Sequence, residues 1–346
     1  MKFIFLFLTF TTFSYLLADE PRIFQQIKKD SGAIILKDLN TNRLIISKDE
    51  NKSLRPASLT KIMTCILAIE SGKMDSVVTI TKPMTEIDPT IINVKVGEQF
   101  YLKDLVHAAM IKSANDAANS IAYYLGNGSK EAFIDMMNIK AQKLGMNETH
   151  FTNPCGFDIG NHHSSAKDLM RLTEYAIQNR TFNSIAKLKT YSFKAINTNS
   201  RYSVLTSNKL QRTDSNILGI KTGFTNAAGP CLIARSVEGN KNLLLVMLNA
   251  GNRWDNAKRV FKQVANPNME EKIATKESVT TQKRKIIEKK QDKKITKKLS
   301  NKKEVAKKTK KNSKKQLKKS KSKKVNQKSK EPKKEKERKV KQLFNS

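Results

Sequence analysis

The sequence predicts an α+β fold: an antiparallel sheet flanked by helices, with an inserted all-helical lobe, followed by a disordered lysine-rich tail. Apolar, β-branched segments occur near both ends of the central part of the chain, and segments with helical periodicity lie between them. Strands that are far apart in the sequence, with helices between them, are typical of a sheet assembled from both ends of a domain. A cleft is therefore expected between the sheet and the lobe.

Local patterns give the expected elements in order. Two short apolar runs at 33–36 and 44–46, separated by turn-forming residues at 38–42, predict an opening hairpin. Helical patterns come next, then strand-like runs and one last helical pattern. The helices are expected to begin at Ser58 and to span 102–112, 116–125, 130–144, 166–178 and 253–264, and the strands to span 217–222, 231–237 and 243–248.

Residues 1–18 have the pattern of a secretory signal peptide. A lysine at position 2 precedes a largely apolar run of sixteen residues, 3–18, which is shorter than the roughly 20 residues that a membrane-spanning helix needs. Ala18 is the expected last residue of the cleaved segment, and an uncleaved anchor is the alternative. Either way the protein is expected to be exported, with a folded domain over 19–266 and a tail over 267–346.

The tail carries most of the positive charge. Of the 66 Lys and Arg and the 31 Asp and Glu in the chain, residues 271–346 hold 32 and 8, which gives this segment +24 of the net +35. It has few apolar residues, so it is not expected to fold alone. Attraction to anionic lipids or cell-wall polymers would contribute about 1 kcal/mol per lysine near the surface; a solvated tail without a specific partner is equally open.

Nucleic acid is not the expected partner of this basic segment. Counterion release would make such a tail bind nucleic acid in a test tube. Stacking on bases, however, needs aromatic side chains, and Phe344 is the only one after residue 266. An exported protein also seldom meets chromosomal DNA.

The cysteines predict neither a disulfide framework nor a catalytic thiol. There are three of them, Cys65, Cys155 and Cys231, an odd number without paired spacing. Cys65 follows Ser58 on the same helix and Cys231 lies in an apolar strand, so both are expected in the core. Cys155 lies in a loop, where a reactive thiol is the alternative.

The histidines predict no metal centre, and no cofactor is expected. His107, His150, His162 and His163 belong to no cluster of His, Cys and carboxylates at ligand spacing. The adjacent pair His162 and His163 is expected to be loop structure near the cleft.

Three short motifs carry the chemistry. They are Ser-Leu-Thr-Lys at 58–61, Ser-Ala-Asn at 113–115 and Lys-Thr-Gly at 221–223, which in this order indicate an acyl-transfer site. The Ser-x-x-Lys spacing alone is weak, because lysine is abundant and the same spacing recurs, for example at 164–167. The setting singles out Ser58: a proline precedes it at position 56, and Gly72 ends the apolar run that follows.

The spacing of Ser58 and Lys61 has a physical reason. Residues three apart lie on one face of a helix, so the Lys61 amine can reach the Ser58 hydroxyl. Because Ser58 lies in the first turn, the free amides and the positive end of the helix dipole favour an anionic adduct there. An unperturbed lysine is almost fully protonated at neutral pH, so Lys61 needs desolvation or a nearby cation to act as a base. Lys221 is the candidate cation.

With these motifs, the chain resembles the D-alanyl-D-alanine carboxypeptidases, the low-molecular-mass penicillin-binding proteins related to serine β-lactamases. The resemblance covers roughly residues 24–264, and the stretches 150–154, 163–168 and 219–225 extend it beyond the minimal motifs. It implies the β-lactamase-like fold, a peptidoglycan pentapeptide substrate, β-lactams as covalent inhibitors, and a location in the bacterial periplasm or at the outer face of the cytoplasmic membrane. Residues 19–266 would then be the catalytic domain.

The resemblance also implies a role for each site residue. Ser58 would be the nucleophile, Lys61 its base and Ser113 the proton relay to the leaving amine. The amides of Ser58 and Phe224 would form the oxyanion hole. The remaining groups would bind the peptide: its amide at Asn115, its backbone along Gly223, and its terminal carboxylate at Lys221, Thr222 and Arg253.

Alternatives remain open at this point. An endopeptidase or transpeptidase would use the same serine and differ in the leaving group. A class A β-lactamase is disfavoured, because no Glu-x-x-Leu-Asn string follows Ser113 to position a deacylating water. A polyanion- or envelope-binding protein acting through its tail is the non-enzymatic alternative. Relatives often continue into a small β-rich domain and a terminal amphipathic helix, and neither is evident after Asn266.

Overall fold

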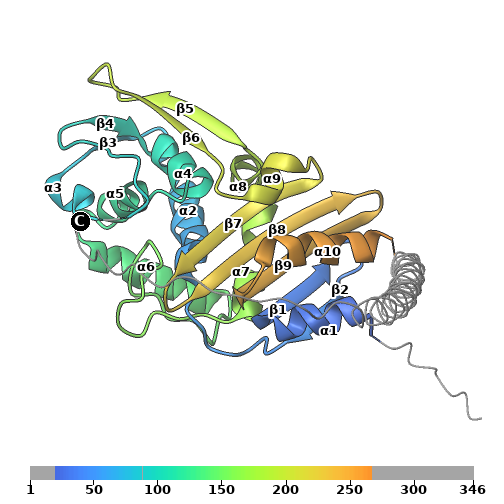
Figure 1. Ribbon diagram of the computed structural model, residues 1–346. Coiled ribbons are helices and arrows are strands. Elements are labelled where there is room, and N and C mark those ends of the chain that lie inside the picture. Colours follow the sequence, from blue (N-terminus) through green and yellow to red (C-terminus); the bar gives the residue numbers. More distant parts are fainter. Residues whose placement is uncertain (1–19, 88, 267–346) are drawn as a thin grey trace, which may run out of the picture. The chain divides into compact units, whose positions relative to one another are not determined.

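The computed structural model describes residues 20–87 and 89–266 (Figure 1). The strands are β1 (Ser31–Asp38), β2 (Arg43–Lys48), β3 (Val77–Thr79), β4 (Gln99–Tyr101), β5 (Thr190–Lys194), β6 (Arg201–Leu205), β7 (Ile217–Thr225), β8 (Gly229–Glu238) and β9 (Lys241–Ala250). The helices are α1 (Arg22–Lys29), the 3₁₀ turn η1 (Ala57–Thr60), α2 (Lys61–Glu70), α3 (Lys82–Thr85), α4 (Leu102–Ile111), α5 (Asn115–Leu125), α6 (Lys130–Lys143), α7 (Ala166–Gln178), α8 (Arg180–Ala186), α9 (Lys209–Thr213) and α10 (Arg253–Ala265).

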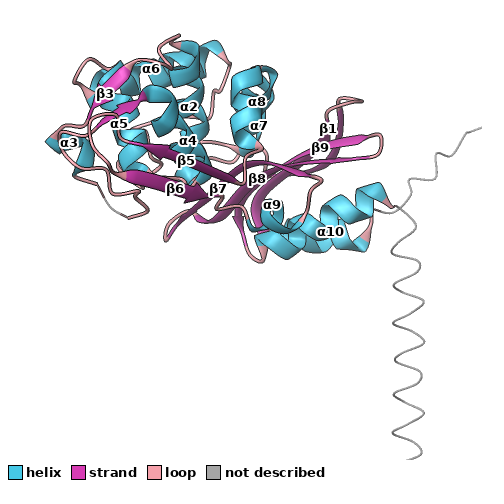
Figure 2. Cartoon of the chain, turned by 90° about the horizontal axis from the view of Figure 1, so that it is seen from above, coloured by secondary structure: helices cyan, strands magenta, loops and turns pink. Residues whose placement is uncertain are grey.

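A five-stranded antiparallel sheet forms the frame, in the order β2-β1-β9-β8-β7. Its inner strands are apolar on both faces because helices cover both: α1 and α10 on one, α7 and α8 on the other (Figures 1 and 2). Along β1, Ile34 and Leu36 pack towards α1 and α10, whereas Ala33 and Ile35 belong to the larger core on the opposite face. β7 is an edge strand of this sheet, so one side of its backbone is not paired with another described strand.

The helical lobe stands beside the β7 edge of the sheet. It comprises α2, α4, α5 and α6 with the short β3–β4 pair and α3 (Figure 1). Eight of the ten residues of α2 are buried, since α2 packs against α4, α5 and α7. A helix that is apolar all round is expected to occupy such a position.

The expected α+β architecture is confirmed, including the opening hairpin and the three strands near the end. The helix expected from Ser58 begins as the 3₁₀ turn η1 and becomes α-helical at Lys61. Several elements had no prediction: α1, α3, α8, α9 and the pairs β3–β4 and β5–β6. They are three to eight residues long, too short for periodicity to identify them reliably.

The cysteine predictions agree with the structure. Cys65, Cys155 and Cys231 are all buried and unpaired, and burial raises the pKa of the Cys155 thiol to about 11, which makes it unreactive. Over the described ranges, no helix is long and apolar enough to cross a bilayer. The segments predicted as signal peptide, 1–18, and tail, 267–346, lie outside the described residues.

Candidate active site

Ser58 and Lys61 meet as their spacing predicts. Ser58 lies in η1 and is half-buried, and Lys61 begins α2 and has no exposed surface. The Lys61 Nζ lies 3.0 Å from the Ser58 Oγ. Asn115, the first residue of α5, brings its Oδ1 to 2.7 Å from the same amine.

A backbone carbonyl completes the surroundings of the amine. The carbonyl oxygen of Cys155 lies 2.7 Å from the Lys61 Nζ. A neutral amine has two N–H donors and one lone pair, and the Asn115 and Cys155 oxygens can only accept. Both N–H groups are therefore directed to these oxygens, which leaves the lone pair for the third hydrogen-bond partner among the described residues, the Ser58 hydroxyl, which carries a proton. This is the arrangement that a general base needs.

Burial favours the neutral form of both lysines of the site. Burial lowers the pKa of Lys61, and Lys221 is almost as deeply enclosed, with 1% of its surface exposed. Burial again lowers the pKa of Lys221 well below its usual range, and the nearby charge of Lys61 lowers it further. Two ammonium groups repel each other mutually, so a proton on one disfavours a proton on the other. Of the two causes proposed for activating Lys61, burial is thus the principal one.

The Lys-Thr-Gly segment lies on β7, beside the turn η1 that carries Ser58, here called the nucleophile turn. The Lys221 Nζ donates to the Thr222 carbonyl at 3.1 Å, and the Thr222 hydroxyl is 2.6 Å from that of Ser207, a neighbour the sequence did not indicate. A Cβ on Gly223 would lie 3.0 Å from the Ala57 Cβ and 3.2 Å from the Ser58 nitrogen. The sequence assigned Gly223 to the approach of a peptide; its close neighbour in the structure is the nucleophile turn.

Phe224 and Arg253 complete this edge of the site. The Phe224 side chain is 60% exposed, and Phe224 stands opposite Pro230, which has no N–H to offer the Phe224 carbonyl. Arg253 is half-buried at the start of α10, and its Nη1 donates to the backbone carbonyls of Gly223 and Cys231. The guanidinium thus braces β7 against β8, and its remaining N–H groups are available to a ligand.

Ser113 and Asn115 come from the junction of α4 and α5. Ser113 has φ +71°, a left-handed conformation that a side chain rarely adopts. Its hydroxyl makes no hydrogen bond to any residue in the described part of the chain, so the structure places it without assigning it a partner. The Asn115 amide also donates to the Pro89 carbonyl. Its oxygen keeps one lone pair and its nitrogen one N–H for a substrate.

The loop around Asn153 holds the Cys155 carbonyl in place, and the sequence analysis did not identify this role. Asn153 Oδ1 accepts the backbone N–H groups of Cys155, Gly156 and Phe157 at 2.7–3.1 Å. Gly156 has φ +91°, and a Cβ there would lie 1.9 Å from the Ala57 carbonyl oxygen, so only glycine fits. A backbone acceptor leaves no side-chain signal; the Asn-Pro-Cys-Gly turn sequence was the available clue.

His162 contacts the nucleophile turn and is not among the described hydrogen-bond partners of the Lys61 amine. It is fully buried, and its Nδ1 accepts the Thr152 N–H at 3.0 Å. Its proton is therefore on Nε2, which lies 2.8 Å from the Thr60 hydroxyl. Thr60 in turn donates to the carbonyl of Ala57, which has φ +49°. This agrees with the expectation that the histidine pair is loop structure.

Comparison with known proteins identifies the family of the chain. The profile of the peptidase S11 family, described as D-alanyl-D-alanine carboxypeptidase, matches residues 20–252. The chain belongs to this family. The resemblance drawn from the three motifs is thereby confirmed, and the family's activity is that of a serine-type D-Ala-D-Ala carboxypeptidase.

Some relatives of the chain are named carboxypeptidases and others endopeptidases. The chain is 30% identical over 264 residues to the D-alanyl-D-alanine carboxypeptidase DacF of Bacillus subtilis, covering 74% of this chain and 67% of that protein. It is 34% identical over 230 residues to a D-alanyl-D-alanine endopeptidase of Escherichia coli, covering 65% and 73%.

Solved structures show the same fold. A D-alanyl-D-alanine carboxypeptidase from Mycobacterium tuberculosis gives a TM-score of 0.63 at 26% identity and covers 67% of this chain and 90% of that chain. The Streptomyces K15 DD-transpeptidase gives 0.64 at 25% identity and covers 67% and 96%. The chain thus has the penicillin-binding-protein fold.

The burial of His162 predicts a pH-dependent stability. Burial, aided by the charge of Arg55, lowers the pKa of His162 to about 3. The unfolded chain, in which this histidine has a pKa of about 6.5, therefore binds more protons than the folded one, and stability is lost as pH falls below that value. From pH 7 to pH 5 this group should cost about 2 kcal/mol of unfolding free energy, measurable by urea denaturation.

Two variants isolate this effect. H162Q should lose less stability than the parent over the same pH interval, because glutamine does not titrate, whereas H163Q, at the more exposed neighbour, should follow the parent. An unchanged pH dependence in H162Q would contradict the assignment.

Proposed function

We propose that this chain removes the terminal D-alanine from peptidoglycan stem pentapeptides through an acyl-enzyme on Ser58. The observation that carries the proposal is the enclosure of Lys61. Its amine is fully buried, 3.0 Å from the Ser58 hydroxyl, and its other two partners are acceptors only. Such an amine is prepared to take a proton from that hydroxyl and from neither of its other two partners.

The first half of the reaction forms an ester. Lys61 takes the Ser58 proton while the Ser58 oxygen attacks the carbonyl between the two terminal D-alanines. The C–N bond then breaks, and the leaving amine receives a proton by way of Ser113. Water attacks the ester in the second half and releases the shortened peptide with the serine restored. The Ser58 and Phe224 amides would stabilise the oxyanion in both halves, which is typically worth roughly 3 kcal/mol per donor.

Substrate binding is proposed along the free edge of β7. An extended peptide would pair with this strand near Gly223, with its amide near Asn115. Its terminal carboxylate would face Lys221, Thr222 and the free N–H groups of Arg253. An arriving carboxylate favours the charged form of Lys221, and that charge, by repulsion, favours the neutral form of Lys61. The substrate would thus help to activate the base.

Location and the tail belong to the same proposal. We infer that residues 1–18 direct export, that residues 19–266 are the catalytic domain, and that the enzyme works in the periplasm or at the outer face of the cytoplasmic membrane. The lysine-rich segment 267–346 would hold it near anionic lipids or cell-wall polymers.

A fluorescent penicillin tests the nucleophile. The parent should be labelled covalently at Ser58. S58A should show no labelling and should release D-alanine from a pentapeptide at least about 10³-fold more slowly. Labelling of S58A equal to that of the parent would exclude Ser58 as the nucleophile.

The pH dependence of acylation tests the base. Lys61 acts only when neutral, so the acylation rate should fall as pH falls. Because burial lowers the pKa of Lys61, this loss should occur below the ordinary lysine range, as followed by stopped-flow labelling. K61R should lose activity about as fully as K61A, by roughly 10²- to 10⁴-fold, since arginine stays protonated. K209A, at an exposed lysine on α9, is the matched control, and activity in K61R would rule out the base assignment.

Deletion of residues 271–346 tests the tail. The full chain should sediment with bacterial envelopes at low salt and be released at high salt, whereas the truncated chain should stay in solution. Partitioning that is the same for both chains and insensitive to salt would remove the anchoring role.

A further inference from the structure

Asp116 is a buried carboxylate that the proposed reaction does not use. It follows Asn115 in the first turn of α5, and 2% of its surface is exposed. Over residues 20–87 and 89–266 it makes no ion pair. A buried carboxylate is costly unless other groups satisfy it. Backbone N–H groups do so here, and they show which part of the chain Asp116 holds.

The carboxylate of Asp116 holds the loop 89–94. Its Oδ2 accepts three successive backbone N–H groups at 2.7–3.2 Å, those of Ile92, Asn93 and Val94. Hydrogen bonds to an ionised acceptor are stronger than those between neutral groups. The loop needs such support, because Thr90 and Asn93 have left-handed backbones, with φ +65° and +67°.

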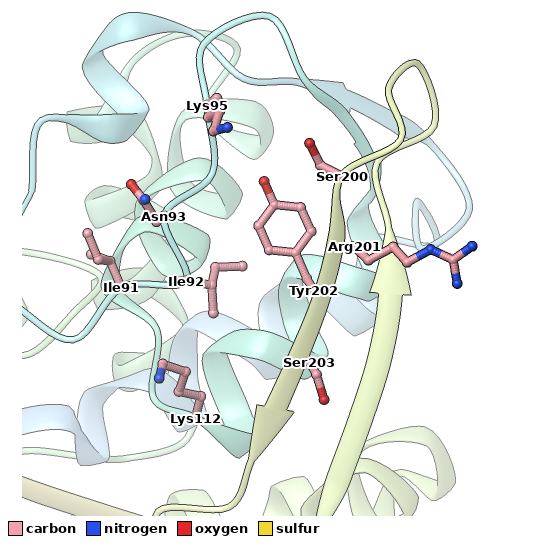
Figure 3. A pocket seen from close by; sticks show the side chains of 9 residues that line it. All are labelled: Ile91, Ile92, Asn93, Lys95, Lys112, Ser200, Arg201, Tyr202 and Ser203. Carbon is pink, nitrogen blue, oxygen red and sulfur yellow. The ribbon is translucent and has the colours of Figure 1, made fainter.

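Packing supports this loop over only part of its surface. Val94 is buried, whereas Pro89 and Thr90 are exposed. A cavity of about 490 Å³ has the loop as one wall and β6 as another, and Figure 3 shows Ile92 facing the Tyr202 ring across this space. The shape of the loop therefore depends on its hydrogen bonds to the carboxylate as well as on side-chain contacts.

The first residues of the loop hold Asn115. The Pro89 carbonyl accepts from the Asn115 side-chain amide, and the Thr90 carbonyl accepts the Asn115 backbone N–H at 2.8 Å. A carbonyl oxygen can only accept, so the NH₂ end of the amide must face Pro89. The oxygen end of the amide is thereby turned to the Lys61 amine, at 2.7 Å.

The end of the amide that faces Lys61 decides whether this amine can act as a base. With the oxygen there, the amine directs an N–H to it and keeps its lone pair for the Ser58 hydroxyl. With the amide reversed, its NH₂ group would donate to that lone pair, and the amine could not accept the proton of Ser58. A chain of contacts thus leads from the buried carboxylate, through the loop, to the base.

We propose that Asp116 is a positioning residue for the general base of the reaction. By holding the loop 89–94, it fixes the orientation of the Asn115 amide. The fixed amide keeps the Lys61 lone pair directed at the Ser58 hydroxyl. The inference rests on the proposed function, in which Lys61 takes the proton of Ser58.

The other acceptor of the amine has a comparable support. The Cys155 carbonyl belongs to the loop in which Asn153 Oδ1 accepts three successive backbone N–H groups. The two acceptors that orient the Lys61 amine thus depend on two loops, and each loop is held by one buried side-chain oxygen.

D116N tests this role with little change in side-chain volume. Whichever way the introduced amide is turned, its NH₂ group faces backbone N–H groups that also donate, either those of Asn93 and Val94 or that of Ala117. The loop should therefore loosen. The rate constant for acylation by a fluorescent penicillin, per labelled enzyme, should fall roughly 10- to 100-fold.

D168N is the matched control. Asp168 is also a buried carboxylate in the first turn of a helix, α7, where it accepts the Glu148 N–H and the Thr149 hydroxyl, both at 2.8 Å. D168N should be acylated at the parent rate. A rate as low as that of D116N would overturn the inference, because loss of any buried carboxylate would then have the same effect.

The rates are compared on the plateau of the pH profile. Burial lowers the pKa of Lys61, and the charge of Asp116 opposes this shift. Removal of the charge should therefore move the acid limb of the D116N profile to lower pH. On the plateau Lys61 is neutral in both proteins, so a lower plateau reports geometry and not charge. A shifted limb with a parent plateau would overturn the inference.

A double-mutant cycle with N115A shows whether Asp116 acts through Asn115. In the N115A background, D116N should slow acylation by less than about threefold, because the amide that it orients is absent. An equal slowing in both backgrounds would overturn the inference. If D116N yields no labelled protein, the same cycle is run with P89G, which loosens the exposed end of the loop and leaves the carboxylate intact; a parent rate in P89G would then overturn it.

The parent protein separates the two levels of the argument. A parent that penicillin does not label would overturn the proposed function, and the inference with it. A labelled parent whose D116N variant is acylated at the same rate would overturn the inference alone.

Discussion

The enclosure of two lysine amines beside one hydroxyl is the constraint on which the rest of the site depends. Burying an ammonium is costly unless it is paired, and here neither Lys61 nor Lys221 has a carboxylate partner among the described residues. Burial lowers the pKa of both amines. The neutral form that this favours costs less free energy to bury than an ammonium group. The same burial that opposes stability therefore makes an otherwise inert amine available as a base.

Four parts of the chain must converge to keep these amines buried. The turn η1 and helix α2 supply the hydroxyl and the first amine, α5 and the loop after Asn153 supply its acceptors, and β7 supplies the second amine. Such close approach requires glycine at the contacts: a Cβ at Gly156 would overlap the Ala57 carbonyl, and a Cβ at Gly223 would crowd the Ser58 nitrogen. Ala57, next to Ser58, and Ser113, two residues before Asn115, both have a left-handed backbone, a conformation that persists only where the surrounding structure holds it.

The sequence was informative where function depends on side chains at fixed spacing. Ser58 and Lys61 could be paired in advance because one helical turn joins them, and the long apolar strands predicted the sheet. The Cys155 carbonyl could not be anticipated, because a backbone oxygen is common to all residues. The β5–β6 pair does alternate, with Tyr191, Phe193, Tyr202 and Val204 more buried than their neighbours, but each strand has only five residues.

The sheet order has a consequence for how this domain is made. β1 pairs with β9, so that Ile35 lies opposite Val246, and the two inner strands come from opposite ends of the domain. A growing chain that emerges from its N-terminus holds β1 and the nucleophile helix long before β9 exists. Contacts so distant in sequence close slowly and late. Until β9 has been made, the sheet that carries Lys221 lacks an inner strand, so a chain interrupted before residue 241 is unable to enclose the amines of its reactive centre.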